Sequence, residues 1–281
     1  MNIASIIVTK RKSLGMTQQI LADKLHVSFQ AVSKWETGAA FPEIELLPQI
    51  ADVLGTSVDA LVGYQRPRIT DYEEKYKADD FYWGIAPNSM CYEIMRRKPP
   101  TKPVKVLDIG CGEGKDAIFL ARNGYLVSAF DAAESGLDKG RALAEKLGVY
   151  VDFFKADIRD YRLSENYDVV FSSGVFHYLK QEMRKEFIDN MKEHTNTAGI
   201  HAINVFVNKP FIGLPPDLEE NEKVDYGWKS GELYTYYSDW MMRKTDEIIF
   251  DCNSGGISHK HCMNIMIASH YSSLFLGGTG Y

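Results

Sequence analysis

The sequence has little of what marks a membrane protein or a secreted one. No uninterrupted apolar run among its 281 residues approaches the length of a membrane span. Lys10, Arg11 and Lys12 follow the first apolar stretch, whereas a signal peptide places its basic residues in front. Only four cysteines are present, and their spacing matches no disulfide framework. We therefore expect no membrane partner and a reduced, cytoplasmic setting.

The chain also lacks an excess of positive charge. Its net charge is −6, and residues 1–66 contain six Lys or Arg and six Asp or Glu, so the remaining residues carry the whole negative charge. A phosphate backbone requires a basic face, which argues against nucleic-acid binding by the larger part of the chain. The length suggests about two domains, and the hydrophobic content of 45% is enough for a real core.

Three alternating glycines form the most informative pattern in the chain. Gly110, Gly112 and Gly114 follow a short apolar run that contains Asp108, and a helical segment comes next. This order predicts a strand, a tight turn and a helix, as at the carboxyl edge of a parallel sheet. A dinucleotide site uses G-x-G-x-x-G around a pyrophosphate, which a neighbouring carboxylate would repel. The pattern therefore favours a cationic, phosphate-free cofactor, and S-adenosylmethionine carries an ammonium and a sulfonium.

Two further acids follow the next predicted strands. Asp131 comes after the apolar run Leu126–Phe130, and Asp157 comes after the predicted strand Tyr150–Ala156. Strand ends of a parallel sheet share one crevice, so Asp131 could accept both ribose hydroxyls and Asp157 an adenine amino group. The alternative for each acid is a helix N-cap or a strand-end turn.

The stretch Val106–Gly114 resembles the first motif of the class I S-adenosylmethionine-dependent methyltransferases, and the resemblance extends over about residues 70–271. It implies that the glycine turn and Asp108 flank the methionine part of the cofactor, that Asp131 binds the ribose, and that Asp157 and the backbone of Ile158 bracket the adenine. The residues expected to bind the cofactor are Asp108, Gly110, Cys111, Gly112, Gly114, Asp131, Ala132, Asp157, Ile158 and Ser173.

Within that family, the chain is similar to the tellurite-resistance methyltransferases. The likeness rests on Lys229–Tyr234, on Trp240, and on Gly255 and Gly256 followed by His259–His261 and an apolar strand. It implies methyl transfer to tellurite, selenite or another small, soft nucleophile. Such an acceptor needs no general base, because the enzyme mainly aligns the reactants and excludes water.

Candidate acceptor groups lie after the fourth predicted strand and before the first. His177, in the stretch Ser173–Tyr178, could orient an oxyanion or shuttle a proton; the alternative is a histidine at a helix start with a satisfied ring. Tyr82 and Trp83 could form an aromatic wall for the sulfonium, or could simply pack in the core. Arg184 and Lys229 are basic candidates for an anionic acceptor, and we expect each to be a solvated surface group.

Four residues near the C-terminus have the side chains of metal ligands. Cys252, His259, His261 and Cys262 do not match common zinc spacings, and adjacent strand residues such as His261 and Cys262 point to opposite faces. We therefore expect hairpin residues and no metal site.

The first 63 residues predict a run of short helices. Helices two and three are separated by only His26–Ser28, which is helix-turn-helix spacing. Thr17–Gln19, Val27–Glu36 and Gly38 resemble the Xre/Cro/C1 repressors, which implies that Phe29–Glu36 is the recognition helix on double-stranded DNA. Ala31, Val32 and Trp35 have the spacing of its buried face. The predicted DNA contacts are Gln18, Phe29, Gln30, Ser33 and Lys34.

The alternative is a module that docks or dimerises the protein and never reads DNA. Phe29 stands where many relatives carry Arg or another polar residue, so a charged anchor is lost. If DNA is read, we expect a homodimer, because one such module buries little DNA surface.

The predicted organisation is a helix-turn-helix domain at 1–63, a linker at 64–70 and a methyltransferase domain at 71–281. The large domain reads as a doubly wound, Rossmann-like α/β sheet that ends in an antiparallel hairpin around the turn 253–256. A Pro-rich insertion at 208–228 could act as a lid, and the tail at 277–281 is expected to be loose.

The leading function is methylation of a small molecule by an enzyme fused to a DNA-binding module. The alternative is a transcription regulator whose large domain only senses S-adenosylmethionine or another ligand. Methylation of a nucleic acid or a protein ranks last, because no Asn-Pro-Pro-Tyr-type motif is present and residues 67–281 are acidic.

Overall fold

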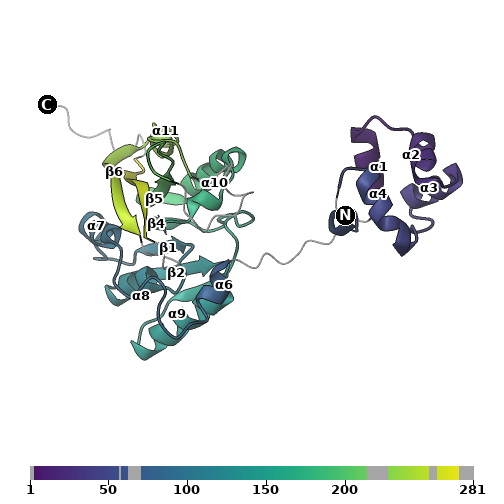
Figure 1. Ribbon diagram of the computed structural model, residues 1–281. Helices are drawn as coiled ribbons and strands as arrows, with labels where there is room; N and C mark the ends of the chain where they lie inside the picture. The colour runs from purple at the N-terminus through teal and green to yellow at the C-terminus, as the bar shows by residue number, and fades with distance from the viewer. Residues whose placement is uncertain (1–2, 57, 63–70, 214–226, 253–257, 272–281) are drawn as a thin grey trace. The chain divides into compact units, whose positions relative to one another are not determined.

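A computed structural model describes residues 3–56, 58–62, 71–213, 227–252 and 258–271. The predicted linker, most of the Pro-rich insertion, the hairpin turn and the C-terminal tail lie outside the described residues. The chain divides into two compact units, Met1–Arg68 and Ile69–Tyr281 (Figure 1).

The first unit is helical. Its helices are α1 (Ile3–Ser13), α2 (Gln18–Leu25), α3 (Phe29–Thr37), α4 (Leu47–Val53) and α5 (Val58–Leu61). Thr17 and Ser28 cap α2 and α3 by accepting hydrogen bonds from the backbone N–H groups of Ile20 and Ala31. Gly38 ends α3 in the left-handed conformation, with φ of 76°.

One expected helix of this unit is divided. The sequence predicts a continuous helix at 43–54, but the structure has a 3₁₀ turn η1 (Ile44–Leu46) followed by α4. Pro48 lies in the first turn of α4, where its missing N–H costs nothing; inside a longer helix it would break a hydrogen bond. The core of the unit includes Leu21, Val32, Trp35 and Ile50.

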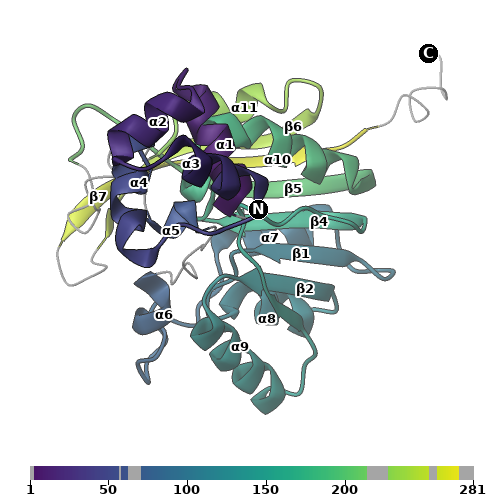
Figure 2. The ribbon, with the colours of Figure 1, turned by 90° about the vertical axis from the view of Figure 1, so that its right-hand side faces the viewer.

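The second unit is built on a seven-stranded sheet with the order β3-β2-β1-β4-β5-β7-β6 (Figures 1 and 2). The strands β1 to β5 pair in parallel, and β7 runs antiparallel to both β5 and β6. The strand bounds are β1 (Lys105–Ile109), β2 (Leu126–Asp131), β3 (Asp152–Lys155), β4 (Tyr167–Ser173), β5 (Thr195–Val207), β6 (Met241–Cys252) and β7 (His259–Ser269). The expected doubly wound sheet with a final hairpin is confirmed.

Helices cover both faces of this sheet. One apolar layer includes residues of α7 (Ser89–Arg97), α8 (Lys115–Arg122) and α9 (Glu134–Lys146). The other layer includes residues of α10 (Gln181–Glu193) and α11 (Glu232–Thr235), together with the 3₁₀ turn η2 (Phe176–Tyr178). A short helix, α6 (Asp71–Lys75), precedes this arrangement and was not predicted.

Two elements are shorter in the structure than the sequence predicts. The strand expected at 150–156 covers only Asp152–Lys155, and the helix expected at 231–240 covers only Glu232–Thr235. After α11 the chain forms turns that bury Tyr237 and Trp240 beside His201. Tertiary packing of these rings outweighs the local preference for helix.

Candidate active site

The three glycine positions of the turn between β1 and α8 have no room for a Cβ atom. A Cβ atom on Gly110 would lie 2.4 Å from Cγ2 of Val175, and one on Gly114 would lie 2.7 Å from Cζ of Phe153. Gly110, Gly112 and Gly114 all have positive φ angles of 54–78°. The turn is therefore built from the only residue type that fits both its conformation and its neighbours.

Asp131 at the end of β2 holds this turn in place. Its Oδ2 accepts a hydrogen bond from the Gly112 N–H at 2.8 Å, and its Oδ1 accepts one from the Ala133 N–H at 2.9 Å. The Cys111 N–H donates to the Phe130 carbonyl at 2.9 Å, which fastens the turn to β2. Burial raises the pKa of Asp131, although the N–H donors oppose that shift. Asp131 and the glycine turn, which the sequence predicts to share one crevice, are in direct contact.

Asp108 is a buried acid with an unused oxygen. It is 2% exposed, and its Oδ2 has no hydrogen-bond partner among the described residues. Burial raises the pKa of Asp108 well above its ordinary value, and the nearby Asp116 raises it further. A positive charge close to this carboxyl would lower that pKa and satisfy the buried oxygen.

Asp116 is part of the same region and was not predicted as a site residue. Its Oδ1 accepts a hydrogen bond from the Asn88 N–H at 2.6 Å, and its Oδ2 pairs with the Lys115 ammonium at 2.9 Å. The sequence signal was present, because an acid in the first turn of a helix that follows a glycine turn complements the helix dipole.

An aromatic cluster packs against the glycine turn. Tyr76 is buried, and its hydroxyl is the atom that a Cβ on Gly112 would meet at 2.8 Å. The Trp83 indole N–H donates to that hydroxyl at 3.1 Å, and the Tyr82 and Trp83 rings meet edge to face with centroids 4.8 Å apart. The buried Tyr82 hydroxyl has no hydrogen-bond partner in the part of the chain described. Tyr82 and Trp83 thus belong to a segment that borders the turn, and their role as an aromatic wall stays a prediction.

The buried Glu113 fastens this segment to the sheet. Its Oε1 pairs with the Lys139 ammonium at 2.7 Å, and the same ammonium donates to the Asp80 carbonyl oxygen at 2.6 Å. Neither Glu113 nor Tyr76 was predicted as a site residue. The first glycine motif contains Glu113, but its partner Lys139 is visible only in three dimensions.

The end of β4 holds a network of amide and hydroxyl groups. The Ser173 hydroxyl accepts hydrogen bonds from Asn88 Nδ2 at 3.0 Å and from Asn204 Nδ2 at 2.9 Å. Asn204 also accepts from the Gly174 N–H at 2.6 Å. Sequence reasoning missed both asparagines, although a polar residue inside the apolar strand β5 is a recognisable signal.

His177 lies in η2, just beyond this network. Its ring packs on Tyr178 and Phe206, with centroids 4.1 Å and 5.2 Å away. Burial, together with the nearby His261, lowers the pKa of His177 to about 3. The ring is therefore neutral at pH 7 and can orient a polar group without adding charge.

One predicted site residue, Asp157, has another partner in the structure. The Asp157 carboxylate forms a fork with the guanidinium of Arg159, and Asp157 Oδ1 also accepts the Arg159 N–H at 2.9 Å, so the strand-end turn considered above is present. Ile158 is buried beside it, and Ala132 lies in the turn after Asp131, half-buried. The roles predicted for Asp157, Ile158 and Ala132 toward a cofactor stay predictions.

The expectation that Arg184 is a solvated surface group is wrong. Arg184 is 4% exposed, and it donates to the carbonyls of Leu179 and Gly227 and pairs with Glu232 at 2.8 Å. Its guanidinium lies 4.1 Å from the ring centroid of Trp228. These partners use its donors for packing. Lys229 is exposed, as expected.

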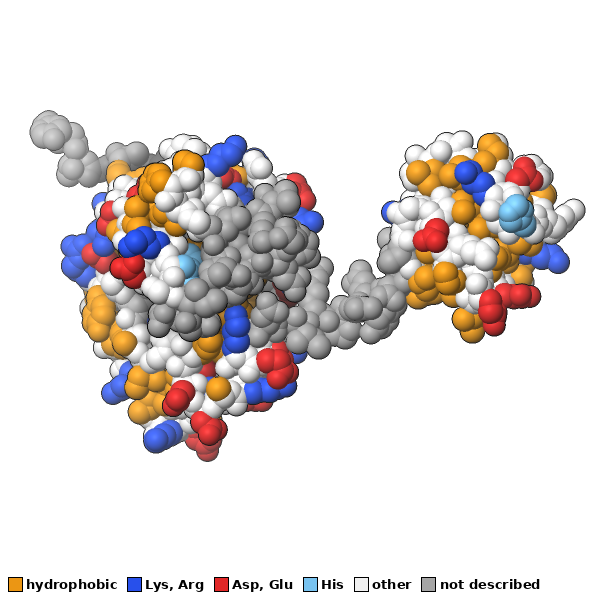
Figure 3. Space-filling view, in the orientation of Figure 1, with side chains coloured by type: hydrophobic (Ala, Val, Ile, Leu, Met, Phe, Trp, Pro, Cys, Tyr) orange, Lys and Arg blue, Asp and Glu red, His pale blue; other side chains and the backbone are white. Residues whose placement is uncertain are grey.

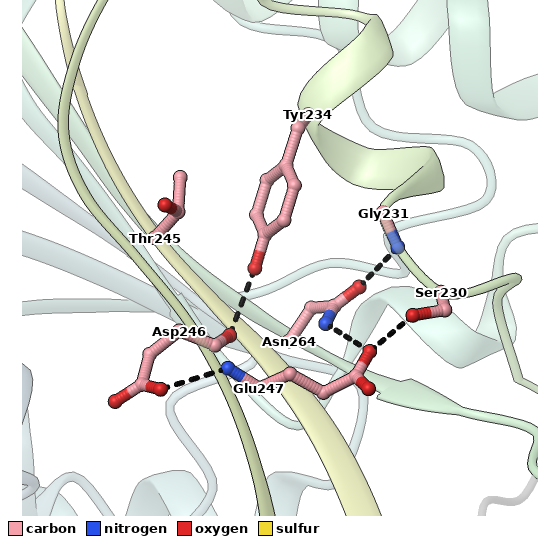
Figure 4. Close-up of a pocket in the computed structure, with 7 residues that line it drawn as sticks. All are labelled: Ser230, Gly231, Tyr234, Thr245, Asp246, Glu247 and Asn264. Carbon is pink, nitrogen blue, oxygen red and sulfur yellow. Dashed lines mark hydrogen bonds between the residues drawn. The ribbon is translucent and has the colours of Figure 1, made fainter.

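The motif at 229–234 connects α11 to the final hairpin through hydrogen bonds (Figure 4). The Gly231 N–H donates to Asn264 Oδ1 at 2.8 Å, and the Tyr234 hydroxyl donates to the Asp246 carbonyl at 2.8 Å. Glu247 accepts from Ser230 and Asn264, and its pairing with Lys209 lowers the pKa of its carboxyl to about 2. These groups line a hollow of about 380 Å³ and satisfy one another, so we assign the motif a structural role.

In the first unit, four of the predicted DNA contacts lie on one face of α3. Phe29, Gln30 and Lys34 are exposed and Ser33 is half-buried, while Val32 and Trp35 are buried on the other side. Ala31 is only partly covered. Gln18, predicted to meet phosphate, donates its amide N–H to Glu36 Oε2 at 2.7 Å. Arg11 also binds Glu36, through its Nη2 at 2.9 Å, so Gln18 belongs to a half-buried network.

In the view of Figure 3, the larger unit shows no patch made of Lys and Arg alone, because these side chains are interspersed with Asp and Glu. No helix within the described ranges is both long enough and apolar enough to span a bilayer.

The sheet order, the glycine turn and the acids at the ends of β1 and β2 define a class I methyltransferase fold. The chain belongs to the TehB family of tellurite-resistance proteins, whose model matches residues 78–256. A helix-turn-helix model matches residues 7–61. The expected family and fold are thus confirmed for both units.

Individual relatives agree with this assignment. A probable S-adenosyl-L-methionine-dependent methyltransferase TehB of Haemophilus influenzae is 32% identical over 145 residues, which is 52% of this chain and 49% of that protein. The crystal structure of TehB from Haemophilus influenzae superposes with a TM-score of 0.58 at 26% identity, covering 71% of this chain and 65% of that one. The chain thus spans about half the length of the curated TehB protein that it matches.

A methyltransferase from Methanosarcina mazei shares the fold alone, with a TM-score of 0.51 at 15% identity; the match covers 66% of this chain and 98% of that one.

Proposed function

We propose that residues 71–281 transfer the methyl group of S-adenosylmethionine to a small, soft nucleophile, and that residues 1–63 bind DNA. One observation carries the first part. A turn whose three glycine positions have no room for a Cβ lies between the buried Asp108, whose Oδ2 lacks a partner among the described residues, and Asp131. A phosphate-bearing ligand would be repelled by these carboxylates, whereas an ammonium would be stabilised by them.

The residues present fit this cofactor. Asp108 would hold the amino group, Asp131 would accept the ribose hydroxyls, and the glycine turn would let the backbone approach closely. Tyr82 and Trp83 would cover the cationic centre with ring faces. Bound S-adenosylmethionine supplies a methyl group on a sulfonium, which a nucleophile removes by in-line displacement.

For the acceptor we propose tellurite, selenite or a molecule of similar softness. A neutral His177 can orient a polar acceptor without a proton transfer, and a soft anion needs no base. The relative from Haemophilus influenzae carries the TehB name, which favours tellurite as the first acceptor to test.

The decisive experiment is calorimetric titration of S-adenosylmethionine into wild type and Asp108→Asn. Asparagine keeps the shape and removes the charge, so we expect the variant to fold. It should lose one charge-assisted hydrogen bond of about 1.5–3 kcal/mol, which corresponds to roughly 10- to 100-fold weaker binding. Asp152→Asn, on the outer strand β3, is the matched control and should bind normally.

Turnover is measured separately, as release of S-adenosylhomocysteine with tellurite, selenite and small thiols. Equal affinity of wild type and Asp108→Asn would refute the proposed cofactor role. Tight binding without any turnover would favour the regulator that only senses its ligand.

DNA binding rests on the exposed face of α3. Binding sites are selected from a randomised duplex library, and the enriched duplex is then used in gel shifts. Gln30→Ala combined with Lys34→Ala should weaken binding by roughly tenfold or more, because one base contact and one phosphate contact are lost. Gln49→Ala, an exposed residue of α4, is the control. An unaltered shift, or no enriched sequence, would instead support a docking or dimerising module. Specific binding should need two copies of the chain.

A further inference from the structure

Three side chains whose spacing matches no common zinc pattern converge where β6 ends and β7 begins. Cys252 ends β6, and His259 and His261 begin β7. Each offers one donor atom, and these atoms all lie within 4.8 Å of one another. The two histidines approach most closely, with their Nε2 atoms 2.9 Å apart.

The strand register explains this convergence. Cys252 and His259 are directly opposite each other across the antiparallel pair, so their side chains share a face. His261 lies two residues along β7 and points to the same face. Cys262 points to the other face, where it packs in the core beneath α10 and α11, and it is no part of the cluster.

The donor set has a specific chemical preference. Two imidazole nitrogens and one thiolate suit a borderline-soft ion such as zinc, whereas calcium and magnesium prefer oxygen. Zinc–nitrogen bonds of about 2.0–2.1 Å at tetrahedral angles place two ligand nitrogens about 3.3 Å apart. The present separation of 2.9 Å between the Nε2 atoms needs only a small rotation of the rings to reach that value.

His261 is held for this role by its surroundings. It is 8% exposed, and its ring packs between Phe206 and Phe250, with centroids 4.6 Å and 5.6 Å away. Cys252 and His259 are half-buried, so solvent can reach the cluster. A rigid ligand beside two accessible ones allows an ion to enter without unfolding the sheet.

We propose that Cys252, His259 and His261 form a zinc site with one coordination position left open. Three protein ligands plus an exchangeable fourth is the arrangement of zinc sites that act on bound molecules. When zinc binds, the Cys252 thiol loses its proton to solvent and both imidazoles bind through neutral nitrogens. Phe206 packs on both His261 and His177, so the site adjoins the end of β4.

The test uses the full chain without S-adenosylmethionine, so that it is independent of methyl transfer. The metal-free protein is titrated with zinc against a chromophoric chelator, and with cobalt, whose absorption spectrum gains a charge-transfer band when a thiolate is bound. We expect one ion per chain. Cys252→Ser should abolish the thiolate band, and His259→Gln should weaken zinc binding by about a hundredfold, or roughly 2.7 kcal/mol.

Cys262→Ser is the matched control and should leave both signals unchanged. Cys252→Ser and His259→Gln change half-buried residues, so circular dichroism should show that these variants fold. Zinc binding that is equally strong in the Cys252→Ser, His259→Gln double variant would mean adventitious binding elsewhere and would overturn the proposal. So would a cobalt spectrum without a thiolate band in the wild type.

Discussion

Replacing Gly110 with alanine tests whether the turn must be made of glycine. The left-handed backbone at φ of 68° should cost an L-residue about 1–2 kcal/mol. Alanine also restricts the unfolded chain more than glycine does, which offsets about 0.4–1 kcal/mol of that cost. The new methyl group would lie 2.4 Å and 2.6 Å from the Val175 methyl groups, and overpacking of this kind costs about 1–3 kcal/mol. We therefore expect Gly110→Ala to destabilise the larger unit by about 2–4 kcal/mol.

Gly148→Ala is the matched control. Gly148 has nearly the same φ, 67°, but a Cβ there would meet nothing within 4 Å. Only the backbone cost remains, so this variant should lose about 0.5–1 kcal/mol and keep its affinity for S-adenosylmethionine. The difference between the two variants isolates the contact with Val175.

The assay is urea unfolding followed by circular dichroism, with and without S-adenosylmethionine. The transition that the ligand shifts belongs to the larger unit, which separates it from the unfolding of residues 1–68. Val175→Ala removes the two clashing methyl groups. The loss of stability in the double variant with Gly110→Ala should therefore be smaller than the sum of the two single losses by at least about 1 kcal/mol. Equal losses in Gly110→Ala and Gly148→Ala would refute the reasoning.

Three further predictions concern buried polar groups. Burial lowers the pKa of His201 to about 3, so between pH 6.5 and pH 3 the unfolded state binds one proton more than the folded state. The free energy of unfolding should therefore decrease as the pH is lowered through that window, by up to about 5 kcal/mol. A His201→Gln variant with the same pH profile as the wild type would contradict this. Arg11→Ala leaves the carboxylate of Glu36 buried beside a single amide donor. In urea unfolding, this variant should lower the free energy of unfolding of residues 1–68 by about 3 kcal/mol. Lys12→Ala changes an exposed residue and should lower it little. Arg184→Lys cannot reproduce the contacts with Trp228 and two carbonyls, so thermal melting should show a loss of about 2–3 kcal/mol; an unchanged melt would mean that the guanidinium geometry is unimportant.

Local signals in the sequence were sufficient for most of the fold. The caps Thr17 and Ser28 and the C-terminal Gly38 are defined by residue types with strong backbone preferences. The glycine turn is equally legible, because only glycine tolerates its conformation. The division between η1 and α4 was not predicted, although Pro48 in the sequence is a signal that a helix begins there.

The site could be predicted where its parts belong to one motif or follow neighbouring strands, as Asp131 does. Asp108 and the glycines belong to one motif, but Asn88, Ser173 and Asn204 come from three distant segments and meet only in the folded sheet. Arg184 illustrates the opposite error, since an arginine on a helix gives no local sign of the tryptophan that covers it. The convergence of Cys252, His259 and His261 could not be predicted from linear spacing, because cross-strand register decides which side chains face each other.

The reversed direction of β7 has a consequence for how this protein can change over time. Because β7 runs against β5, its first residues lie beside the last residues of β5, at the rim where the parallel strands end. Segments from opposite ends of the domain therefore meet at this rim. Substitutions at the start of β7 would change the side chains beside the end of β5 and leave the glycine turn after β1 intact, so these two parts of the domain can vary independently.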